Sequence, residues 1–175
     1  MDRIEVSTVV YLPPEPIYDF LVDFPRYATL SEHLREVRQF GDGDPGTQYH
    51  LSFAWWKLSY TAHSEVTGVE PPTRIDWKLI KDLDARGHWR IDPDEPVPED
   101  REAASRVYLV IRFDPHSADD DAIDLPRFVS LSWVIEKVKP LVQGEAEAIV
   151  EKLVADLEGT RREVELDIHA APESV

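Results

Sequence analysis

The sequence predicts an α+β protein in which a curved antiparallel sheet of about seven strands holds one long C-terminal helix. One observation is a series of short segments between residues 1 and 115 in which apolar and polar residues alternate, as in half-buried strands. The other is the stretch 127–165, where apolar residues recur at steps of three and four, typical of one helix face. Only the strands offer that long face a surface of matching length.

The N-terminal segment predicts one strand followed by two short helices. Residues 3–12 alternate between apolar and polar, which is typical of a strand with one buried face. The pair Pro13-Pro14 ends this strand, because proline cannot continue the hydrogen-bonded ladder. Short helices are then expected at 17–22 and from residue 24 to about residue 30.

Six further strands are expected after these helices, with short links that favour an antiparallel meander. A symmetric hairpin loop at Trp56-Lys57 would place His50 opposite His63 on the outward face. The acidic, proline-rich segment 92–104 is expected to be a surface loop. The six expected strands are 33–40, 47–55, 58–69, 74–80, 85–91 and 107–113.

The C-terminal stretch predicts the long helix, with two interruptions. Pro140 removes a backbone donor and is expected to kink the helix or divide it. Gly159 is expected to mark fraying near its end. We expect residues 1–166 to form a single domain, followed by a flexible tail at 167–175.

The composition limits the classes of function. The chain has 35 acidic and 19 basic residues, and its net charge of −16 argues against nucleic acid or an anionic membrane as a partner. Abundant carboxylates with few lysines resemble proteins of extreme halophiles, and a functional acidic patch is the alternative. No cysteine, signal peptide or membrane-spanning segment is found, which predicts a soluble cytoplasmic protein and leaves its oligomeric state open.

Four stretches carry a family resemblance: residues 10–23, 69–77 and 87–91, and the pair Asp114-Pro115 before the helix. Together they resemble the START-related helix-grip superfamily (SRPBCC), which includes polyketide cyclases/dehydrases, coenzyme Q-binding proteins and lipid-transfer-like carriers such as the birch-pollen-allergen group. The resemblance implies a sheet that grips the long helix around a cavity for an apolar small molecule. It implies no particular reaction, because the fold serves both enzymes and carriers.

The candidate ligand-binding residues are large side chains expected on the sheet face that meets the helix. Such side chains either fill the core or line a hollow for a flat apolar ligand. Small residues on the same face, among them Thr8, Ala62, Ser64 and Gly87, favour a partial hollow. The candidates are Tyr49, Phe53, Trp55, Tyr60, Trp77, Trp89 and Leu109 from the strands, and Phe128 and Trp133 from the helix.

The leading hypothesis is therefore binding or transport of a lipid, quinone or polyketide-like molecule. The alternative is a cyclase or dehydratase that uses a buried tyrosine in the same cavity, and a protein-interaction module is a third interpretation. The pair His50 and His63 with Glu65 could in principle bind zinc, but exposed histidines on an outward face are more typical of an ordinary surface pair. We expect no metal, no cofactor and no catalytic triad.

Overall fold

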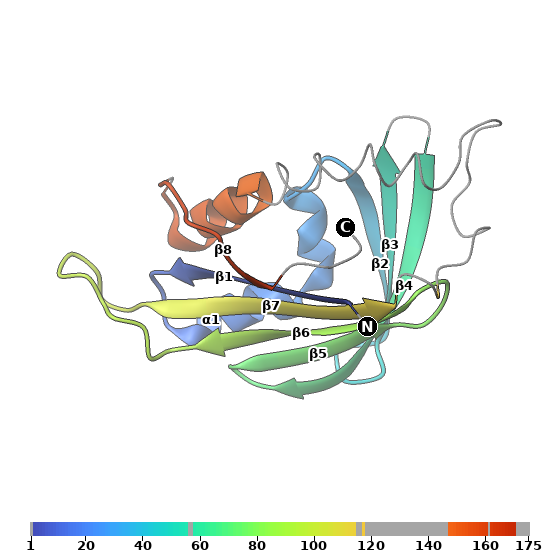
Figure 1. Cartoon of the computed structure of the whole chain (residues 1–175), viewed down its shortest axis with the longest axis horizontal. Coiled ribbons are helices and arrows are strands. Elements are labelled where there is room, and N and C mark those ends of the chain that lie inside the picture. Colours follow the sequence, from blue (N-terminus) through green and yellow to red (C-terminus); the bar gives the residue numbers. More distant parts are fainter. Residues whose placement is uncertain (1, 56–57, 115–116, 118–146, 161, 171–175) are drawn as a thin grey trace.

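The computed structural model describes residues 2–55, 58–114, 117, 147–160 and 162–170 (Figure 1). Its strands form one eight-stranded antiparallel sheet in the order β2-β3-β4-β5-β6-β7-β1-β8. The consecutive pairing of β2 to β7 confirms the expected meander. The strands are β1 (Asp2–Val10), β2 (Leu34–Phe40), β3 (Gln48–Trp55), β4 (Leu58–Glu70), β5 (Arg74–Leu79), β6 (Asp84–Asp92), β7 (Ser105–Asp114) and β8 (Asp167–Ala170).

The sheet is strongly curved, and Figure 1 shows β2, β3 and the start of β4 rising steeply from the plane of β5, β6 and β7. The long strand β4 has a register shift against β5 between Val66 and Gly68. A bulge of this kind bends a strand and increases its local twist. The curvature gives the sheet a concave face, on which the helices pack, and a convex face.

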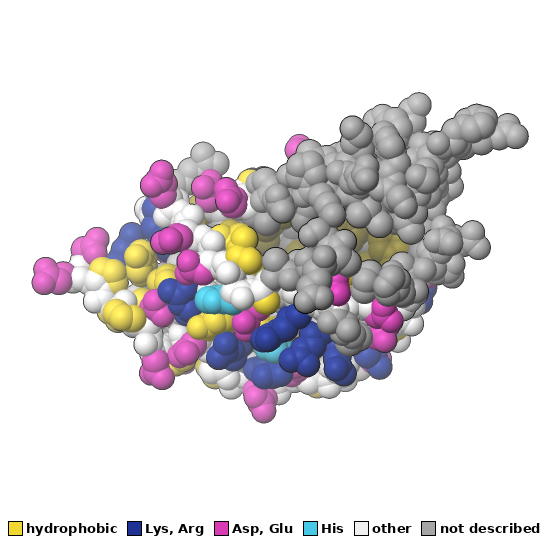
Figure 2. All heavy atoms as spheres, in the orientation of Figure 1, with side chains coloured by type: hydrophobic (Ala, Val, Ile, Leu, Met, Phe, Trp, Pro, Cys, Tyr) yellow, Lys and Arg dark blue, Asp and Glu magenta, His cyan; other side chains and the backbone are white. Residues whose placement is uncertain are grey.

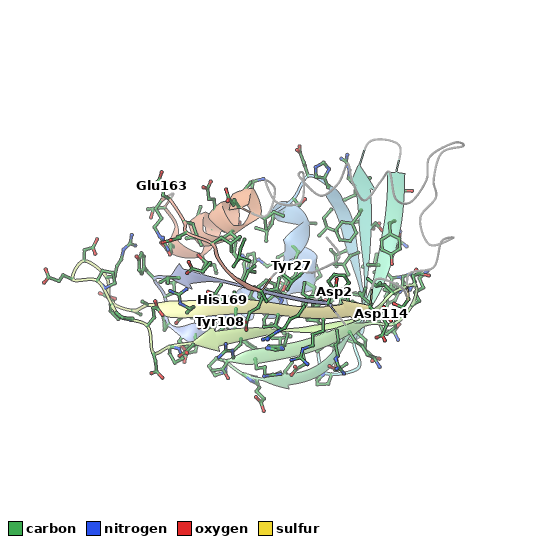
Figure 3. The ribbon with its side chains drawn as sticks, viewed as in Figure 1. Asp2, Tyr27, Tyr108, Asp114, Glu163 and His169 are labelled. Carbon is green, nitrogen blue, oxygen red and sulfur yellow. The ribbon has the colours of Figure 1, made fainter. Side chains whose placement is uncertain are left out.

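The strand count of about seven is wrong by one, because β8 pairs with the middle of β1. Three polar contacts hold β8 in place. The Ser7 Oγ atom lies 2.7 Å from His169 Nε2, Arg106 donates to Asp167 Oδ2 at 2.6 Å, and Thr8 Oγ1 donates to the backbone oxygen of Glu165 at 2.9 Å. Figure 3 shows His169 beside Tyr108 on β7.

Residues 167–170 of the expected tail thus belong to the sheet, and 171–175 lie outside the described residues. Residues 164–170 alternate between apolar and polar, as in a strand, although Ile168 is among the most exposed large apolar side chains. The expected tail overlooked this alternation, which is typical of a strand, and the backbone pairing with β1 confirms it.

Two short helices follow β1, as predicted. Helix α1 (Pro14–Val22) begins three residues before the expected position, with proline in its first turn, where the missing N–H is no loss. It buries Ile17, Phe20 and Leu21. The second is the 3-10 helix η1 (Phe24–Thr29), which buries Phe24.

Of the long C-terminal helix, residues 147–158 are described and are helical. The helix ends at residue 158, next to the expected site of fraying at Gly159, because Gly159 takes a left-handed φ of 81° and its N–H closes the last turn on the Ala155 oxygen at 2.9 Å. The expected kink at Pro140 and the polar loop before the helix lie outside the described residues. No helix within the described part of the chain has the length and apolar content of a membrane span.

The hydrophobic core lies between the concave face and these helices. Leu153 and Val154 from the C-terminal helix are buried in the same cluster as the apolar face of α1. This confirms that the helix packs on the sheet in its described part. The buried cluster comprises Val10, Ile17, Tyr18, Phe20, Leu21, Phe24, Leu30, Tyr49, Val66, Ile75, Ile91, Val107, Leu153 and Val154.

Candidate functional site

An aromatic cluster joins opposite parts of the concave face through η1. The rings of Phe24 and Tyr49 have centroids 4.5 Å apart, and those of Phe24 and Tyr27 are 5.1 Å apart. The Tyr27 ring then meets Trp89 on β6 edge-on at 6.4 Å. Side chains from β3, η1 and β6 therefore form one continuous aromatic wall, which includes two of the predicted site residues.

Phe24 and Tyr27 are not among the sequence-predicted site residues. The segment Phe24-Pro25-Arg26-Tyr27 indicates a break between two helices, and only its 3-10 geometry directs both rings towards the sheet. Spacing alone does not reveal this, although two aromatic residues three apart match one face of a 3-10 turn.

Tyr27 has a structural role in this wall. Its hydroxyl donates a hydrogen bond to the backbone oxygen of Leu21. Burial raises its pKa well above the ordinary value, and a hydrogen bond with Trp89 opposes that shift only in part. Tyr27, labelled in Figure 3, therefore stays protonated, and its hydroxyl is bonded to the protein.

Tyr49 differs from Tyr27 because its hydroxyl has no partner among the described residues. The side chain is 1% exposed, and it lies directly opposite Ser64 on β4. No sealed side-chain polar atom in the described part of the chain lacks a hydrogen-bond partner. Among the described residues, neither Tyr49 nor Ser64 makes a side-chain hydrogen bond, so their hydroxyls lie on neighbouring strands without a described protein partner. Burial, followed by the charge of Asp23, raises the pKa of Tyr49 and keeps it a donor.

The small residues on the concave face do not all leave empty space. A Cβ atom added at Gly87 would lie 2.5 Å from the Trp77 ring and 2.6 Å from the Val110 backbone oxygen. The Trp77 ring thus occupies the space beside Gly87, and the expectation that this glycine leaves room is wrong. Thr8 is also engaged, through its bond to Glu165. Leu109 lies opposite Trp89 and is half-buried.

The outer margin of the concave face carries Phe53 and Tyr60, which lie opposite each other on β3 and β4. Phe53 is 40% exposed, so it is not enclosed. The Tyr60 hydroxyl donates to Asp82 Oδ2 at 3.5 Å, a long hydrogen bond. Burial and then the Asp82 charge raise the pKa of Tyr60. The side chain of Trp55, together with Phe128 and Trp133, lies outside the described part.

The histidine pair takes the predicted register. His50 lies opposite His63 and Gln48 opposite Glu65, and the two imidazole rings stack with centroids 3.7 Å apart. Burial, and then the electrostatic effect of the neighbouring His50 ring, lowers the pKa of His63. Within the described ranges, no three His, Cys, Asp or Glu side chains are arranged to hold a metal ion.

Comparison with known proteins agrees with this architecture. The family model described as "Polyketide cyclase / dehydrase and lipid transport" matches residues 1–158. No curated protein matches the chain by sequence. Among solved structures, the ZhuI aromatase/cyclase from Streptomyces sp. R1128 is similar with a TM-score of 0.64 and 15% identity, over 89% of this chain and 93% of that one.

Two further structures share the fold. A protein from Thermus thermophilus has a TM-score of 0.59 and 14% identity over 90% of this chain and 97% of that chain. A point mutant of norcoclaurine synthase from Thalictrum flavum, solved with a transition-state analogue, has a TM-score of 0.57 and 11% identity over 90% and 94%. At such identities the likeness shows the fold alone. The match over residues 1–158 places the chain in the polyketide cyclase/dehydrase and lipid transport family, within the helix-grip superfamily.

Proposed function

We propose that the protein is a cytoplasmic carrier that binds a hydrophobic small molecule, a lipid, quinone or polyketide-like ring, against the concave face of its sheet. The observation that carries this proposal is a pair of hydroxyls, Tyr49 and Ser64, that lies beside the aromatic wall and has no hydrogen-bond partner among the described residues. Small-molecule sites combine mostly apolar walls with a few polar groups that orient the ligand. These hydroxyls suit a carbonyl or hydroxyl group on a flat apolar ligand, and family membership supports the same class.

The experiment is native mass spectrometry of the protein purified from its own host, before and after organic extraction. We expect a bound apolar molecule that extraction removes. Rebinding is then measured by tryptophan fluorescence with anthraquinone, a short-chain ubiquinone and a fatty acid. Protein that carries no ligand and binds none of the three would contradict the proposal.

Matched variants locate the site. Tyr49→Phe and Ser64→Ala each remove one of these two hydroxyls, and we expect each to weaken binding of a carbonyl-bearing ligand by roughly fivefold, the value of one neutral hydrogen bond. Tyr108→Phe on the convex face removes a similar hydroxyl and should leave affinity unchanged. Equal losses in all three variants would show that the hydroxyls do not contact the ligand.

A cyclase or dehydratase is the second candidate, favoured by the contact between Tyr60 and Asp82 at the margin of the same face. A tyrosine with a raised pKa stays protonated, so it can polarise a carbonyl as a hydrogen-bond donor or general acid. Loss of turnover in Tyr60→Phe with ligand affinity kept would support an enzyme. Unchanged turnover would remove Tyr60 from any catalytic role.

A further inference from the structure

The convex face carries a row of four cationic side chains on four neighbouring strands. Lys78 lies opposite Arg86, Arg86 opposite Arg112, and Arg112 opposite Arg3. Neighbouring strands are about 4.8 Å apart, so the row spans roughly 15 Å. Figure 2 shows Lys and Arg side chains gathered on this face around a histidine, although the chain as a whole has a net charge of −16.

The two ends of the row are neutralised, whereas its centre is not. Lys78 pairs with Glu65 at 3.5 Å, and Arg3 pairs with Glu5 at 3.2 Å. Arg86 and Arg112 are exposed, and neither makes an ion pair with any residue that the structure describes. Two adjacent guanidinium groups therefore carry positive charges that form no ion pair within the described part of the chain.

A groove of about 370 Å³ runs beside these arginines. Val110, which is 3% exposed, lies beneath the charged side chains, and Thr67 and His88 add polar groups to the lining. Burial, and then the charges of Arg74, Arg90 and Arg112, lowers the pKa of His88, with Asp76 opposing the shift. His88 is therefore neutral at pH 7 and available as a hydrogen-bond partner.

This arrangement has a cost in stability. Like charges directly opposite each other on neighbouring strands destabilise a sheet. The chain has 35 acidic residues that could neutralise such positions, yet the only carboxylate in the groove lining among the described residues, Asp76, is held by Arg74 at 3.1 Å. The two adjacent like charges are explained if a bound anion neutralises them.

We propose that the groove on the convex face binds a small phosphate monoester through Arg86 and Arg112. The two positive charges match a phosphate monoester, which carries a charge of about −2 at neutral pH. The guanidinium fork is suited to phosphate oxygens. A small ligand fits better than a nucleic acid or an acidic protein, because the rest of this acidic molecule would repel a large polyanion. The site lies on the opposite side of the sheet from the proposed apolar ligand and does not depend on it.

The protein is titrated with methyl phosphate at constant ionic strength, and binding is measured by calorimetry and ³¹P NMR. Methyl sulfate is the matched probe, since it has similar shape and one negative charge fewer. We expect saturable binding of methyl phosphate and roughly tenfold weaker binding of methyl sulfate. Absence of saturable methyl phosphate binding, or equal affinity for the two probes, would overturn the proposal.

Variants test the assignment to the two arginines. The double variant R86Q/R112Q should lose methyl phosphate affinity by roughly a hundredfold, about tenfold for each charged hydrogen bond. The control R35Q/R38Q removes the same charge from β2, where Arg35 and Arg38 are exposed, and should bind within about twofold of wild type. Equal losses of affinity in the two double variants would show that binding depends only on the net charge of the protein, and would overturn the assignment to Arg86 and Arg112.

Thermal unfolding provides an independent readout that also verifies folding. Methyl phosphate should raise the Tm of the wild type and of the control, but not that of R86Q/R112Q. A glutamate-rich peptide is tested in parallel. If the peptide binds through these arginines more tightly than methyl phosphate, the face belongs to an acidic protein partner and the phosphate proposal fails.

Discussion

The two faces of strands β5, β6 and β7 carry opposite chemistry on alternate residues of the same chain. Trp77, Trp89 and Leu109 belong to the concave face, where apolar rings pack against helices. Their immediate neighbours Lys78 and His88 belong to the convex face, where charged side chains line a groove. A period of two residues is therefore enough to separate an apolar ligand surface from an ionic one.

A different kind of side chain indicates the binding site on each face. On the concave face the hydroxyls of Thr8 and Tyr27 have hydrogen-bond partners, so those of Tyr49 and Ser64 are informative because they have none among the described residues. On the convex face charged groups are common, and most are paired. There the informative feature is the pair Arg86 and Arg112, which lacks a carboxylate partner in the described structure.

The largest expected effect is the loss of stability caused by Gly87→Ala, on the concave face. Gly87→Ala would force a Cβ atom to within 2.5 Å of the Trp77 ring and 2.6 Å of a backbone oxygen, which must shift. We expect the free energy of unfolding to fall by about 3 kcal/mol. Gly68→Ala is the control, because the nearest atom there lies at 3.7 Å. Urea denaturation measures both, and equal stability of the two variants would contradict close packing of Trp77 on Gly87.

The second prediction concerns Glu158, which anchors the end of the C-terminal helix. Its side chain is 1% exposed, accepts two hydrogen bonds of 2.8 Å from Arg162 and a third of 3.0 Å from the Tyr11 N–H, and lies 3.8 Å from Arg101. Glu158→Gln leaves the Arg162 charge without its partner. We expect a loss of about 2 kcal/mol in urea denaturation at pH 7.

The pH dependence of this loss follows from the pKa of Glu158. Burial raises that pKa, but the hydrogen bonds from Arg162 and Tyr11 and the charges of Arg162 and Arg101 outweigh burial and leave it below 4.5. The ion pair therefore contributes fully above about pH 4.5, and its contribution is lost as the pH falls through the lowered pKa. The stability difference between wild type and Glu158→Gln should shrink below pH 4.5. A constant difference down to pH 3 would contradict this ion pair.

A smaller effect distinguishes the two tyrosines of the aromatic wall. Tyr27→Phe removes the bond to the Leu21 oxygen and should lower the free energy of unfolding by about 1.5 kcal/mol. Tyr49→Phe removes a hydroxyl without a described protein partner and should change it by less than about 0.5 kcal/mol. Thermal unfolding of the pair measures both. A larger loss in Tyr49→Phe would mean that its hydroxyl serves the core and not a ligand.

The smallest effect has the opposite sign and belongs to the convex face. Without phosphate, R86Q/R112Q removes a like-charge contact between neighbouring strands and should stabilise the protein by about 0.5 kcal/mol. High salt should abolish this gain, because it screens the repulsion in the wild type. Destabilisation of R86Q/R112Q in low salt would show that the two arginines already have stabilising partners.

Local periodicity predicted most of the fold. The alternation of residues located the seven strands from β1 to β7, and the symmetric loop gave the register of His50 and His63. These features depend on neighbours in the sequence. The eighth strand was not predicted, although residues 164–170 alternate between apolar and polar, and polar contacts with Ser7 and Arg106 hold it beside β1 and β7. Gly159 was expected near the end of the C-terminal helix, and the helix ends at residue 158.

The sequence by itself determined that aromatic residues lie on one face of a curved sheet beneath a helix, because side-chain alternation is a property of the strand. Only the tertiary structure decided which of their polar groups have a protein partner. It gave Tyr27 a hydrogen bond to Leu21, left Tyr49 without a partner among the described residues, and placed the Trp77 ring beside Gly87. It also aligned Arg86 with Arg112, which lie far apart in the sequence. Strand register is a long-range property, and local patterns specify it only where a short hairpin joins the two strands.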